Sequence, residues 1–522
     1  MELNSYVSGR WQKGNDAGVA LVDPTLGAEI ARASTSGIDF GAALGFAREV
    51  GGAELRRMGY GSRAAMLTAL ADTLAANRDD YYAIAQANSG SPKSDAAIDI
   101  EGAIFTMKYF AKLGRSLGDA NHFLDGGLSQ LGKDEAFQAQ HILVPVRGVA
   151  VLINAFNCPA WGMWEKAAPA LLSGVPVFVK PATSTAWLAQ RMIEDIVAAG
   201  VAPEGAISII CGSAGDLLDH LTVDDLVSFT GSAATAARIR THDNVVRSSI
   251  RVNVEADSLN IALLAPDATA GTDEFDLLVK EAAREMTVKA GQKCTAIRRI
   301  LVPKRSADDF SDALAARLAK VVVGNPRNPD IRMGPLVNRD QLAVAREGLA
   351  MLASEATVVC GNAESFEPVD AEIESGAFLP PTLLRCDAPL EARYVHKVEI
   401  FGPTATLMPY YDLSQAYEIA RLGKGSLTAS VWSGDASLLA AAALELADSH
   451  GRVMAVSADV GTSHTGHGNV MPMCLHGGPG RAGGGEELGG LRALGFYHRR
   501  SAIQGPLDAL ENLRTGIETF TV

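Results

Sequence analysis

The sequence lacks long hydrophobic runs, organised cysteines and an excess of basic residues. It contains no stretch of about 18 uncharged apolar residues, the length needed to span a bilayer, and its N-terminus has no apolar signal-peptide core. The chain carries 46 Lys+Arg against 60 Asp+Glu, a net charge of −14, which disfavours binding to nucleic acid or to anionic membranes. We therefore expect a soluble cytoplasmic protein whose partners include neither nucleic acid nor a membrane.

The six cysteines follow no CxxC or Cys/His spacing that would indicate a zinc site or a disulfide framework. We expect free thiols in a reducing compartment, and no metal. The 522 residues are enough for about two to four domains with a large apolar core. The cysteines are Cys158, Cys211, Cys294, Cys360, Cys386 and Cys474.

Apolar runs alternate with helical stretches between residues 147 and 254. Continuous Val/Ile/Leu strands that alternate with helices are typical of a parallel sheet covered on both faces, so this segment predicts a doubly wound α/β unit. The predicted strands are 148–153, 175–179, 206–210, 225–229 and about 249–254, and the predicted helices are 160–172, 184–199, 214–221 and 232–240.

The flanking regions predict further elements. Ser62 is placed to cap a helix whose apolar stripe faces the core. A second α/β stretch is expected after residue 257, with helices at 273–290 and 308–320 and a strand at 298–303. The very Gly-rich stretch 461–490 contains Met-Pro-Met-Cys-Leu, so we expect an ordered loop against backbone or ligand rather than a flexible linker. The stripe comprises Met66, Leu67, Leu70, Ala71 and Leu74.

Two residues of the middle region could carry chemistry. Glu255 ends a predicted strand, and Cys294 follows a Gly-Gln-Lys turn. A cation at Lys293 would favour a thiolate at Cys294 and make it a reactive nucleophile. The alternative is a small buried apolar cysteine, which is the commoner role for a lone Cys.

Three loops offer groups suited to a ligand. Asn157 follows the first predicted strand of the parallel sheet, where such folds bind ligands, and its amide could stabilise an oxyanion or simply cap a helix. The Gly-Ser turn at Ser232 could expose backbone N–H groups to a pyrophosphate, or Ser232 could be an ordinary helix cap. Glu399 lies in the turn EIFGP, which reads equally well as a ligand loop or a plain turn.

Taken in order, these motifs resemble the aldehyde dehydrogenase superfamily. They are Asn157-x-Pro159, Lys180-Pro-Ala, Phe229-Thr-Gly-Ser232, Glu255, Gly-Gln-x-Cys294, Gly-Pro-Leu at 334–336 and Glu399-x-Phe-Gly-Pro. The resemblance runs from SGRW at 8–11 to the final segment. It implies an α/β fold with a Rossmann-like cofactor domain, an α/β catalytic domain and a small β oligomerisation region.

The resemblance also implies a mechanism. Cys294 would be the nucleophile that adds to an aldehyde carbonyl, and Asn157 together with the Cys294 backbone N–H would hold the oxyanion. Transfer of hydride to a nicotinamide would leave a thioester, and Glu255 would activate the water that hydrolyses it. Family members that pass the acyl group to coenzyme A generally lack a base at the position of Glu255, so a free carboxylic acid is the expected product.

By the same resemblance, ten residues would bind the cofactor. Lys180 would reach the adenosine ribose, Ser232 the pyrophosphate and Glu399 the nicotinamide ribose. Many NAD-dependent members have Glu where this chain has Thr183, and because a carboxylate would repel a 2′-phosphate, we expect NADP. The ten residues are Ile153, Asn154, Phe156, Lys180, Thr183, Phe229, Gly231, Ser232, Glu399 and Phe401.

Several segments are similar to the branch of the family that oxidises coenzyme A-linked semialdehydes in aerobic degradation of aromatic acids. They include VNVEADSLN, REMTVKAGQKCTAIRR and HGNVMPMCLHGGPGRAGGGEELGGLRAL. An unsaturated C6 CoA semialdehyde of benzoate degradation is the expected substrate, because the chain ends at Val522 without room for a second enzyme. The alternatives are the semialdehyde of the phenylacetyl-CoA route and a non-catalytic scaffold. Four arginines could meet coenzyme A phosphates, or could simply be solvated surface: Arg481, Arg492, Arg499 and Arg500.

We expect the chain to divide into four regions. Residues 1–128 and 148–257 would bind NADP, and 258–475 would form the catalytic domain with the Cys nucleophile. Residues 129–147 and 497–522 would form the oligomerisation region, and 476–496 a Gly-rich return segment. The resemblance predicts a homodimer or higher homo-oligomer, in which a hairpin near 129–147 pairs with the last segment of a neighbouring subunit.

Overall fold

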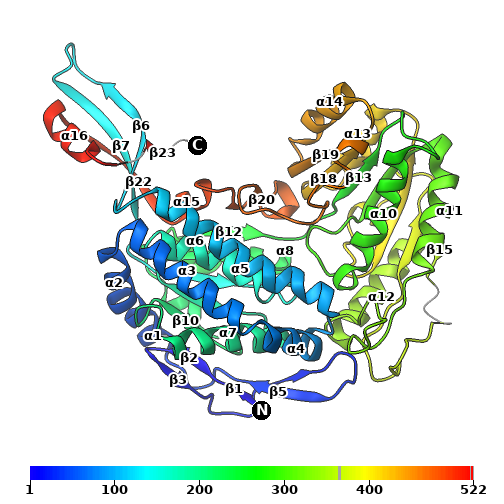
Figure 1. Ribbon diagram of the computed structural model, residues 1–522, viewed down its shortest axis with the longest axis horizontal. Coiled ribbons are helices and arrows are strands. Elements are labelled where there is room, and N and C mark those ends of the chain that lie inside the picture. Colours follow the sequence, from blue (N-terminus) through cyan, green and yellow to red (C-terminus); the bar gives the residue numbers. More distant parts are fainter. Residues whose placement is uncertain (362–365, 518, 521–522) are drawn as a thin grey trace.

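The computed structural model describes residues 1–361, 366–517 and 519–520. The chain forms two α/β lobes and an arm that projects from the first lobe (Figure 1). None of the helices in the described ranges has the length and apolarity needed to cross a membrane.

The first lobe is built on a seven-stranded sheet with the order β12-β11-β8-β9-β10-β2-β3. The run from β12 to β10 is parallel, as predicted, and β2 and β3 are added antiparallel from the N-terminus. The strands are β2 Ser5–Val7, β3 Arg10–Gln12, β8 Ala150–Ile153, β9 Val177–Lys180, β10 Ile207–Ile209, β11 Leu226–Thr230 and β12 Arg251–Glu255.

Helices cover both faces of this sheet, which confirms the doubly wound prediction. Leu152 and Val179 pack toward α3 to α7, whereas Val151 and Val227 pack toward α1, α8 and α9. Successive strand residues point to opposite faces, so most positions of the parallel strands are buried in one layer or the other. The helices are α1 Phe40–Phe46, α2 Gly52–Arg57, α3 Tyr60–Ala76, α4 Arg78–Ser89, α5 Lys93–Ser116, α6 Trp161–Leu172, α7 Ala186–Ala199, α8 Ala233–Arg240 and α9 Asp243–Arg247.

Two local predictions in this lobe were wrong. Ser62 does not cap a helix, because α3 begins two residues earlier, where the N–H groups of Tyr60 and Gly61 donate to backbone carbonyls of a neighbouring loop. The predicted helix at 214–221 is only a single 3₁₀ turn, Leu217–His220, in a segment interrupted by Gly215. The apolar stripe of α3 is buried as predicted.

The second lobe contains another seven-stranded sheet, with the order β15-β16-β17-β14-β13-β18-β19. All its pairs are parallel except β15 with β16. The predicted helix at 273–290 ends at Thr287. The elements are β13 Ile261–Leu264, α10 Asp273–Thr287, β14 Arg299–Pro303, α11 Ala307–Leu318, α12 Arg339–Ala353, β15 Thr357–Cys360, β16 Thr382–Arg385, β17 Thr404–Tyr410, α13 Leu413–Arg421, β18 Ser426–Trp432, α14 Ala436–Leu446 and β19 His450–Val456.

The arm is a four-stranded sheet with the order β22-β7-β6-β23 (Figure 1). The predicted hairpin is present as β6 Phe123–Gln130 and β7 Phe137–Pro145, but its partner was predicted wrongly. Strand β22 (His498–Pro506) pairs antiparallel with β7 of the same chain over its whole length, rather than with that of a neighbouring subunit. The arm also carries α16 Leu507–Arg514 and β23 Thr519–Phe520; residues 518, 521 and 522 of the predicted region lie outside the described residues.

The remaining elements join these parts. Strands β1 Glu2–Leu3, β4 Val19–Val22 and β5 Glu29–Ala33 form a small sheet near the N-terminus, and β20 Leu475–Gly477 pairs with β21 Glu486–Leu488 ahead of α15 Arg492–Phe496. The Gly-rich stretch is ordered against the end of β12, as predicted: Gly485 N donates to Val254 O (3.0 Å), and Ala256 N donates to Ala482 O (2.9 Å).

Candidate active site

A cavity of about 520 Å³ opens at the carboxyl ends of β8, β9, β11 and β12, facing the second lobe. The three predicted catalytic residues and the ten predicted cofactor residues all line it. Because the carboxyl ends of parallel strands meet at one edge of a sheet, loops far apart in the chain converge there. The lining residues named by the sequence are Ile153, Asn154, Phe156, Asn157, Lys180, Thr183, Phe229, Gly231, Ser232, Glu255, Cys294, Glu399 and Phe401.

One end of the cavity is formed by β9, β11 and the start of α8. Thr183 donates its hydroxyl hydrogen to Gly212 O (3.2 Å), and burial lowers the pKa of Lys180. Ser232 is the N-cap of α8 and accepts from Thr235 N (3.3 Å), so it caps a helix and also lines the cavity. A Cβ on Gly231 would lie 2.6 Å from the Phe229 ring, so a larger residue here would have to displace that ring.

The opposite wall carries Glu399 and Phe401. The Glu399 carboxylate accepts from Ser258 N (2.9 Å) and lies 3.6 Å from Arg298 Nε. Burial raises the pKa of Glu399 to about 7, although Arg298 acts in the opposite direction. Phe156 and Phe401 meet edge to face with ring centroids 5.5 Å apart, so the two lobes touch at this cavity.

The loop before Cys294 is held in an unusual backbone conformation. Lys289, Ala290 and Gly291 all have positive φ, and a Cβ on Gly291 would lie 2.2 Å from Gly402 O. The buried Arg298 locks the loop by donating to Gly402 O (2.8 Å), Gly291 O (2.9 Å) and Lys293 O (3.1 Å). The Gly-Gln-Lys-Cys turn therefore presents Cys294 from a rigid base.

The predicted role of Lys293 was wrong. Its Nζ forms a buried ion pair with Glu285 Oε1 at 2.7 Å, so its charge is satisfied on α10 and is not available to the thiol. Burial, followed by the charge of Glu255, raises the pKa of Cys294 well above its usual value. A different cation is needed to favour the thiolate.

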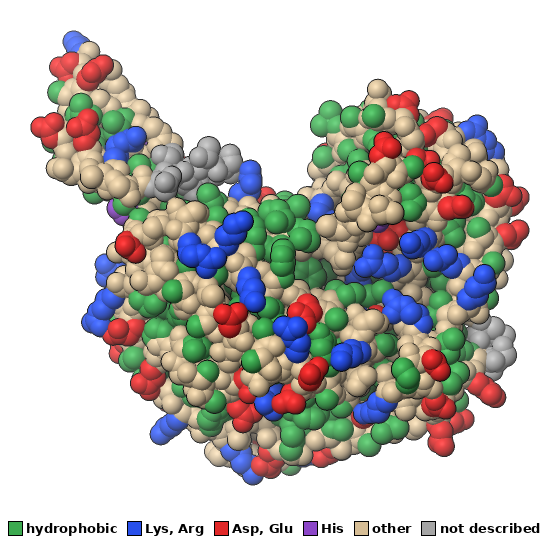
Figure 2. All heavy atoms as spheres, viewed as in Figure 1, with side chains coloured by type: hydrophobic (Ala, Val, Ile, Leu, Met, Phe, Trp, Pro, Cys, Tyr) green, Lys and Arg blue, Asp and Glu red, His purple; other side chains and the backbone are tan. Residues whose placement is uncertain are grey.

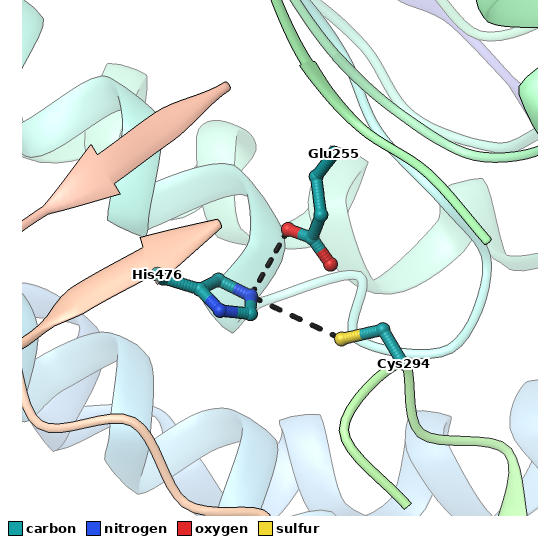
Figure 3. Close-up of side chains that lie close together, drawn as sticks. All are labelled: Glu255, Cys294 and His476. Carbon is teal, nitrogen blue, oxygen red and sulfur yellow. Dashed lines mark hydrogen bonds and ion pairs between the residues drawn. The ribbon is translucent and has the colours of Figure 1, made fainter. Parts of the chain in front are cut away.

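His476, which the sequence reasoning did not select, is the candidate for that cation. Its Nε2 lies 3.0 Å from Glu255 Oε2 and 3.9 Å from Cys294 Sγ, and Figure 3 shows both side chains pointing toward this nitrogen. Burial opposes protonation, but Glu255 outweighs it and raises the pKa of His476 to about 9. His476 in turn holds the pKa of Glu255 at about 2 despite burial.

A second buried charge cluster lies behind Glu255. Lys166 Nζ pairs with Glu165 Oε1 (2.6 Å) and Glu487 Oε2 (2.8 Å), and Ser228 Oγ donates to Glu487 Oε1 (2.7 Å). Oxygens of Glu165, Glu255 and Glu487 lie within 4.8 Å of one another, which makes a chain of carboxylates from the cavity into the first lobe. The pKa of Glu165 is raised to about 7, first by burial and despite Lys166. The expected absence of a metal stays a prediction.

An open groove of about 370 Å³ lies between α5 and the Gly-rich stretch. Its lining is mostly apolar, and Figure 2 shows apolar side chains gathered where the two lobes meet. Trp161 connects the groove to His476, because it lines the groove and its ring stacks on His476 at an interplanar angle of 9°. The groove residues include Ala97, Ile98, Phe105, Thr106, Val470 and Met471.

None of the arginines considered for binding coenzyme A phosphates lines this groove. Arg481 lines the large cavity and donates to Lys397 O (2.9 Å), whereas Arg499 and Arg500 on β22 pair with Asp224 and Asp125. His476, Arg481 and Glu487 all come from the Gly-rich stretch. The sequence could have pointed to them, because they are ionisable residues within a glycine-rich stretch that we expected to be ordered.

Comparison with known proteins gives a consistent result. The family model described as "Aldehyde dehydrogenase family" matches residues 11–501. The chain is 58% identical to the 3,4-dehydroadipyl-CoA semialdehyde dehydrogenase of Aromatoleum evansii, over 92% of this chain and 93% of that protein. It is 27% identical to the succinate-semialdehyde dehydrogenase [NADP(+)] of Escherichia coli (strain K12), over 83% of this chain and 86% of that protein.

Solved structures share the fold. The betaine aldehyde dehydrogenase of Staphylococcus aureus, in complex with NAD+, superposes with a TM-score of 0.83 at 24% identity, over 96% of this chain and 94% of that chain. The family match over most of the chain agrees with the cavity at the carboxyl ends of the strands and with the meeting of Cys294 and Glu255 within it. The chain belongs to the aldehyde dehydrogenase family.

Proposed function

We propose that this enzyme oxidises 3,4-dehydroadipyl-CoA semialdehyde to the corresponding carboxylic acid with NADP, in benzoate degradation. The observation that carries the chemistry is the meeting of Cys294 and Glu255 in the cavity that all the cofactor residues line. The relative with 58% identity carries the substrate assignment by its name.

In the first half-reaction, Cys294 adds to the aldehyde carbon. The Asn157 amide lines the same cavity, and with the Cys294 backbone N–H it would hold the developing oxyanion. Asn260 Nδ2 donates to Cys294 O (2.8 Å) and to Ala296 O (2.9 Å), which orients the peptide that carries the nucleophile. Loss of one oxyanion donor costs about 10²–10³ in rate.

In the second half-reaction, Glu255 accepts a proton from the water that hydrolyses the thioester. Its carboxylate is buried and has a low pKa beside His476, so it is ionised at neutral pH and ready to act as a base. The carboxylate chain through Glu487 and Glu165 lies next to Glu255 and provides further proton acceptors. A base at this position supports a free acid as the product.

The cavity suits a nicotinamide dinucleotide. Buried polar atoms without a hydrogen-bond partner include both side-chain atoms of Asn154, Thr230 Oγ1 and Glu399 Oε1, all on cavity-lining residues, and ribose and amide groups would satisfy them. When bound, the cofactor accepts a hydride from the substrate carbon. Lys180 and Thr183 would hold the adenosine ribose and its 2′-phosphate, because a cation and a hydroxyl suit that anion.

The apolar groove at Trp161 suits the acyl chain of the substrate. The groove reaches Trp161, whose ring stacks on His476 beside Cys294, so a linear chain lying in it would extend toward the sulfur. The coenzyme A part would remain outside, near the groove mouth. Such a groove supports a long unbranched substrate over a small aldehyde.

The two lobes and the arm support the prediction that separate regions of the chain serve cofactor binding, catalysis and assembly. We assign cofactor binding to the β8–β12 sheet, catalysis to the second lobe with the loop of Cys294, and assembly into a homo-oligomer to the arm. A reduced Cys294 requires a reducing compartment, which supports a cytoplasmic location.

The test is an initial-rate comparison of matched substrates. The enzyme is assayed for NADPH formation with 3,4-dehydroadipyl-CoA semialdehyde, with the ring-opened phenylacetyl-CoA semialdehyde, and with a C6 aldehyde that lacks coenzyme A. We expect the highest kcat/KM with the first. Equal kcat/KM for the aldehyde without coenzyme A would refute the substrate assignment, and a preference for the second ester would assign the enzyme to that route.

A further inference from the structure

The arrangement around His476 is unusual because one ring nitrogen faces two acidic groups. Nε2 lies 3.0 Å from Glu255 Oε2 and 3.9 Å from Cys294 Sγ (Figure 3). The ring is held in place by the stacked indole of Trp161 and is only 5% exposed. A rigid N–H donor is thus aimed between the nucleophile and the base.

The surroundings of His476 are strongly acidic. Glu255 comes from the end of β12, Glu165 from α6 and Glu487 from β21, and Lys166 on α6 pairs with the last two. Among the described residues, His476 is the only cationic side chain within hydrogen-bonding distance of Cys294 Sγ. Lys293, next to Cys294 in sequence, is paired with Glu285.

The geometry excludes a relay of the serine-protease kind. In such a relay one ring nitrogen faces the nucleophile and the other faces the carboxylate, so that the imidazole passes a proton along. Here the same nitrogen faces both groups, so a protonated His476 has no free lone pair there with which to take a proton from sulfur. A single fixed N–H can instead face either anion without moving.

We propose that His476 is a positioning residue that remains an imidazolium and balances the charge of whichever partner is ionised, Glu255 or Cys294. The proton of Cys294 passes from Sγ to the Glu255 carboxylate. The S–H bond breaks, an O–H bond forms, and the electron pair stays on sulfur. Nε2–H, which faces both atoms, then balances the negative charge on Sγ instead of that on Oε2, and the net charge of the three groups is unchanged.

This inference rests on the proposed function only for the role of Cys294 as nucleophile. It explains how a thiolate forms in a buried site where Glu255 alone would oppose it. Because the pKa of His476 is about 9, the imidazolium is present below that pH and is lost as the pH rises through it. The reactivity of Cys294 should therefore depend on His476 throughout the neutral range.

The test measures alkylation of Cys294 by iodoacetamide against pH, without substrate or cofactor. The rate is followed at the Cys294 peptide by mass spectrometry, so that exposed Cys474 does not interfere. We compare the wild type with His476→Gln, which keeps a donor but cannot be charged. The matched control is His467→Gln, a buried histidine of the same Gly-rich stretch whose Nδ1 pairs with Ser430 Oγ (2.8 Å).

We expect His476→Gln to raise the pH midpoint of alkylation by at least about one unit, which is about tenfold in thiolate fraction at neutral pH. His467→Gln should leave the midpoint unchanged. An unchanged midpoint in a folded His476→Gln protein would overturn the proposal, since a purely structural role changes activity without moving it. Neither outcome depends on turnover of the proposed substrate, so failure of the proposed function would be seen separately.

A second measurement covers the case in which His476→Gln does not fold. In wild-type enzyme labelled with ¹⁵N-histidine, the NMR signals of His476, assigned by comparison with His476→Asn or by its response to Cys294 alkylation, should report an imidazolium at neutral pH. A neutral ring at that pH would contradict the proposal.

Discussion

The hydroxyl of Thr183 donates a hydrogen bond to the backbone carbonyl of Gly212, 3.2 Å away, at the end of the cavity assigned to the adenosine ribose. The hydroxyl oxygen keeps free lone pairs, but its hydrogen must turn away from Gly212 to reach a 2′-phosphate. Lys180, which ends β9 just before Thr183, would supply the positive charge that makes this exchange favourable.

Replacing Thr183 by Glu should shift cofactor preference from NADP toward NAD. The new carboxylate would repel the 2′-phosphate and could accept from a free ribose hydroxyl, so the NADP/NAD ratio of kcat/KM should fall by at least about tenfold. Thr183→Ser is the matched control, since it keeps the hydroxyl and should keep the preference. An unchanged ratio in Thr183→Glu would show that this position does not select the cofactor.

Replacing Glu255 by Gln should separate the two half-reactions. Acylation by Cys294 should slow, because Gln cannot take the thiol proton, but it can still go to completion, whereas hydrolysis of the thioester lacks its base, so steady-state turnover should fall by about 10²–10⁴. Rapid mixing should then give a burst of NADPH of about one per site, and mass spectrometry of the quenched protein should detect the acyl adduct. Turnover close to that of the wild type would exclude Glu255 as the base.

Much of this site could be predicted because several of its residues follow directly after predicted strands. Each parallel strand ends at the same edge of the sheet, so Asn157, Lys180, Ser232 and Glu255 could be placed together from the strand pattern alone. The family resemblance decided between the two interpretations of Cys294 and of Glu399, which come from the second lobe. The structure brings both into the same cavity.

The remaining features depend on contacts between distant segments. His476 lies 182 residues from Cys294, and no periodicity or spacing links the two. Lys293 was misjudged because sequence adjacency does not show that its side chain turns toward Glu285 on α10. Ser62 was misjudged because the N–H groups of α3 are satisfied by a neighbouring loop, not by a local side chain.

Acid should destabilise the fold through buried neutral histidines. Tyr60 Oη donates to His498 Nε2 (2.7 Å) while His498 Nδ1 donates to Leu494 O (2.6 Å), and burial lowers the pKa of His498 to about 3. In the unfolded chain the pKa of a histidine is about 6.5, so below that pH the imidazole of His498 binds a proton in the unfolded chain but not in the folded chain. Stability should therefore fall as the pH drops from about 6.5 toward about 3.

Urea unfolding at several pH values checks this expectation. Each such histidine contributes up to about 1.4 kcal/mol of lost stability per pH unit across the window, and His396 and His450, with pKa values of about 4, act in the same direction. His498→Gln should be less stable at neutral pH but should show a shallower acid slope. A slope as steep as that of the wild type would rule out His498 as a contributor.

The arm should mediate self-association. Leu131 and Phe137, at its hairpin end, are 48% and 47% exposed, which leaves apolar surface suited to a second subunit. The double variant Leu131→Asp/Phe137→Asp should sediment as a smaller species than the wild type. Val19→Asp, at an exposed apolar position on β4, is the control and should sediment as the wild type does.

The central claim is that Cys294 forms a covalent acyl intermediate from a CoA-linked semialdehyde. The most direct test is intact-protein mass spectrometry of Glu255→Gln mixed with NADP and 3,4-dehydroadipyl-CoA semialdehyde, compared with the double variant that also carries Cys294→Ala. We predict that a mass increase equal to the acyl-CoA group appears in the first protein and is absent from the second. An adduct that persists without Cys294, or NADPH formation by a Cys294→Ala enzyme, would contradict the account.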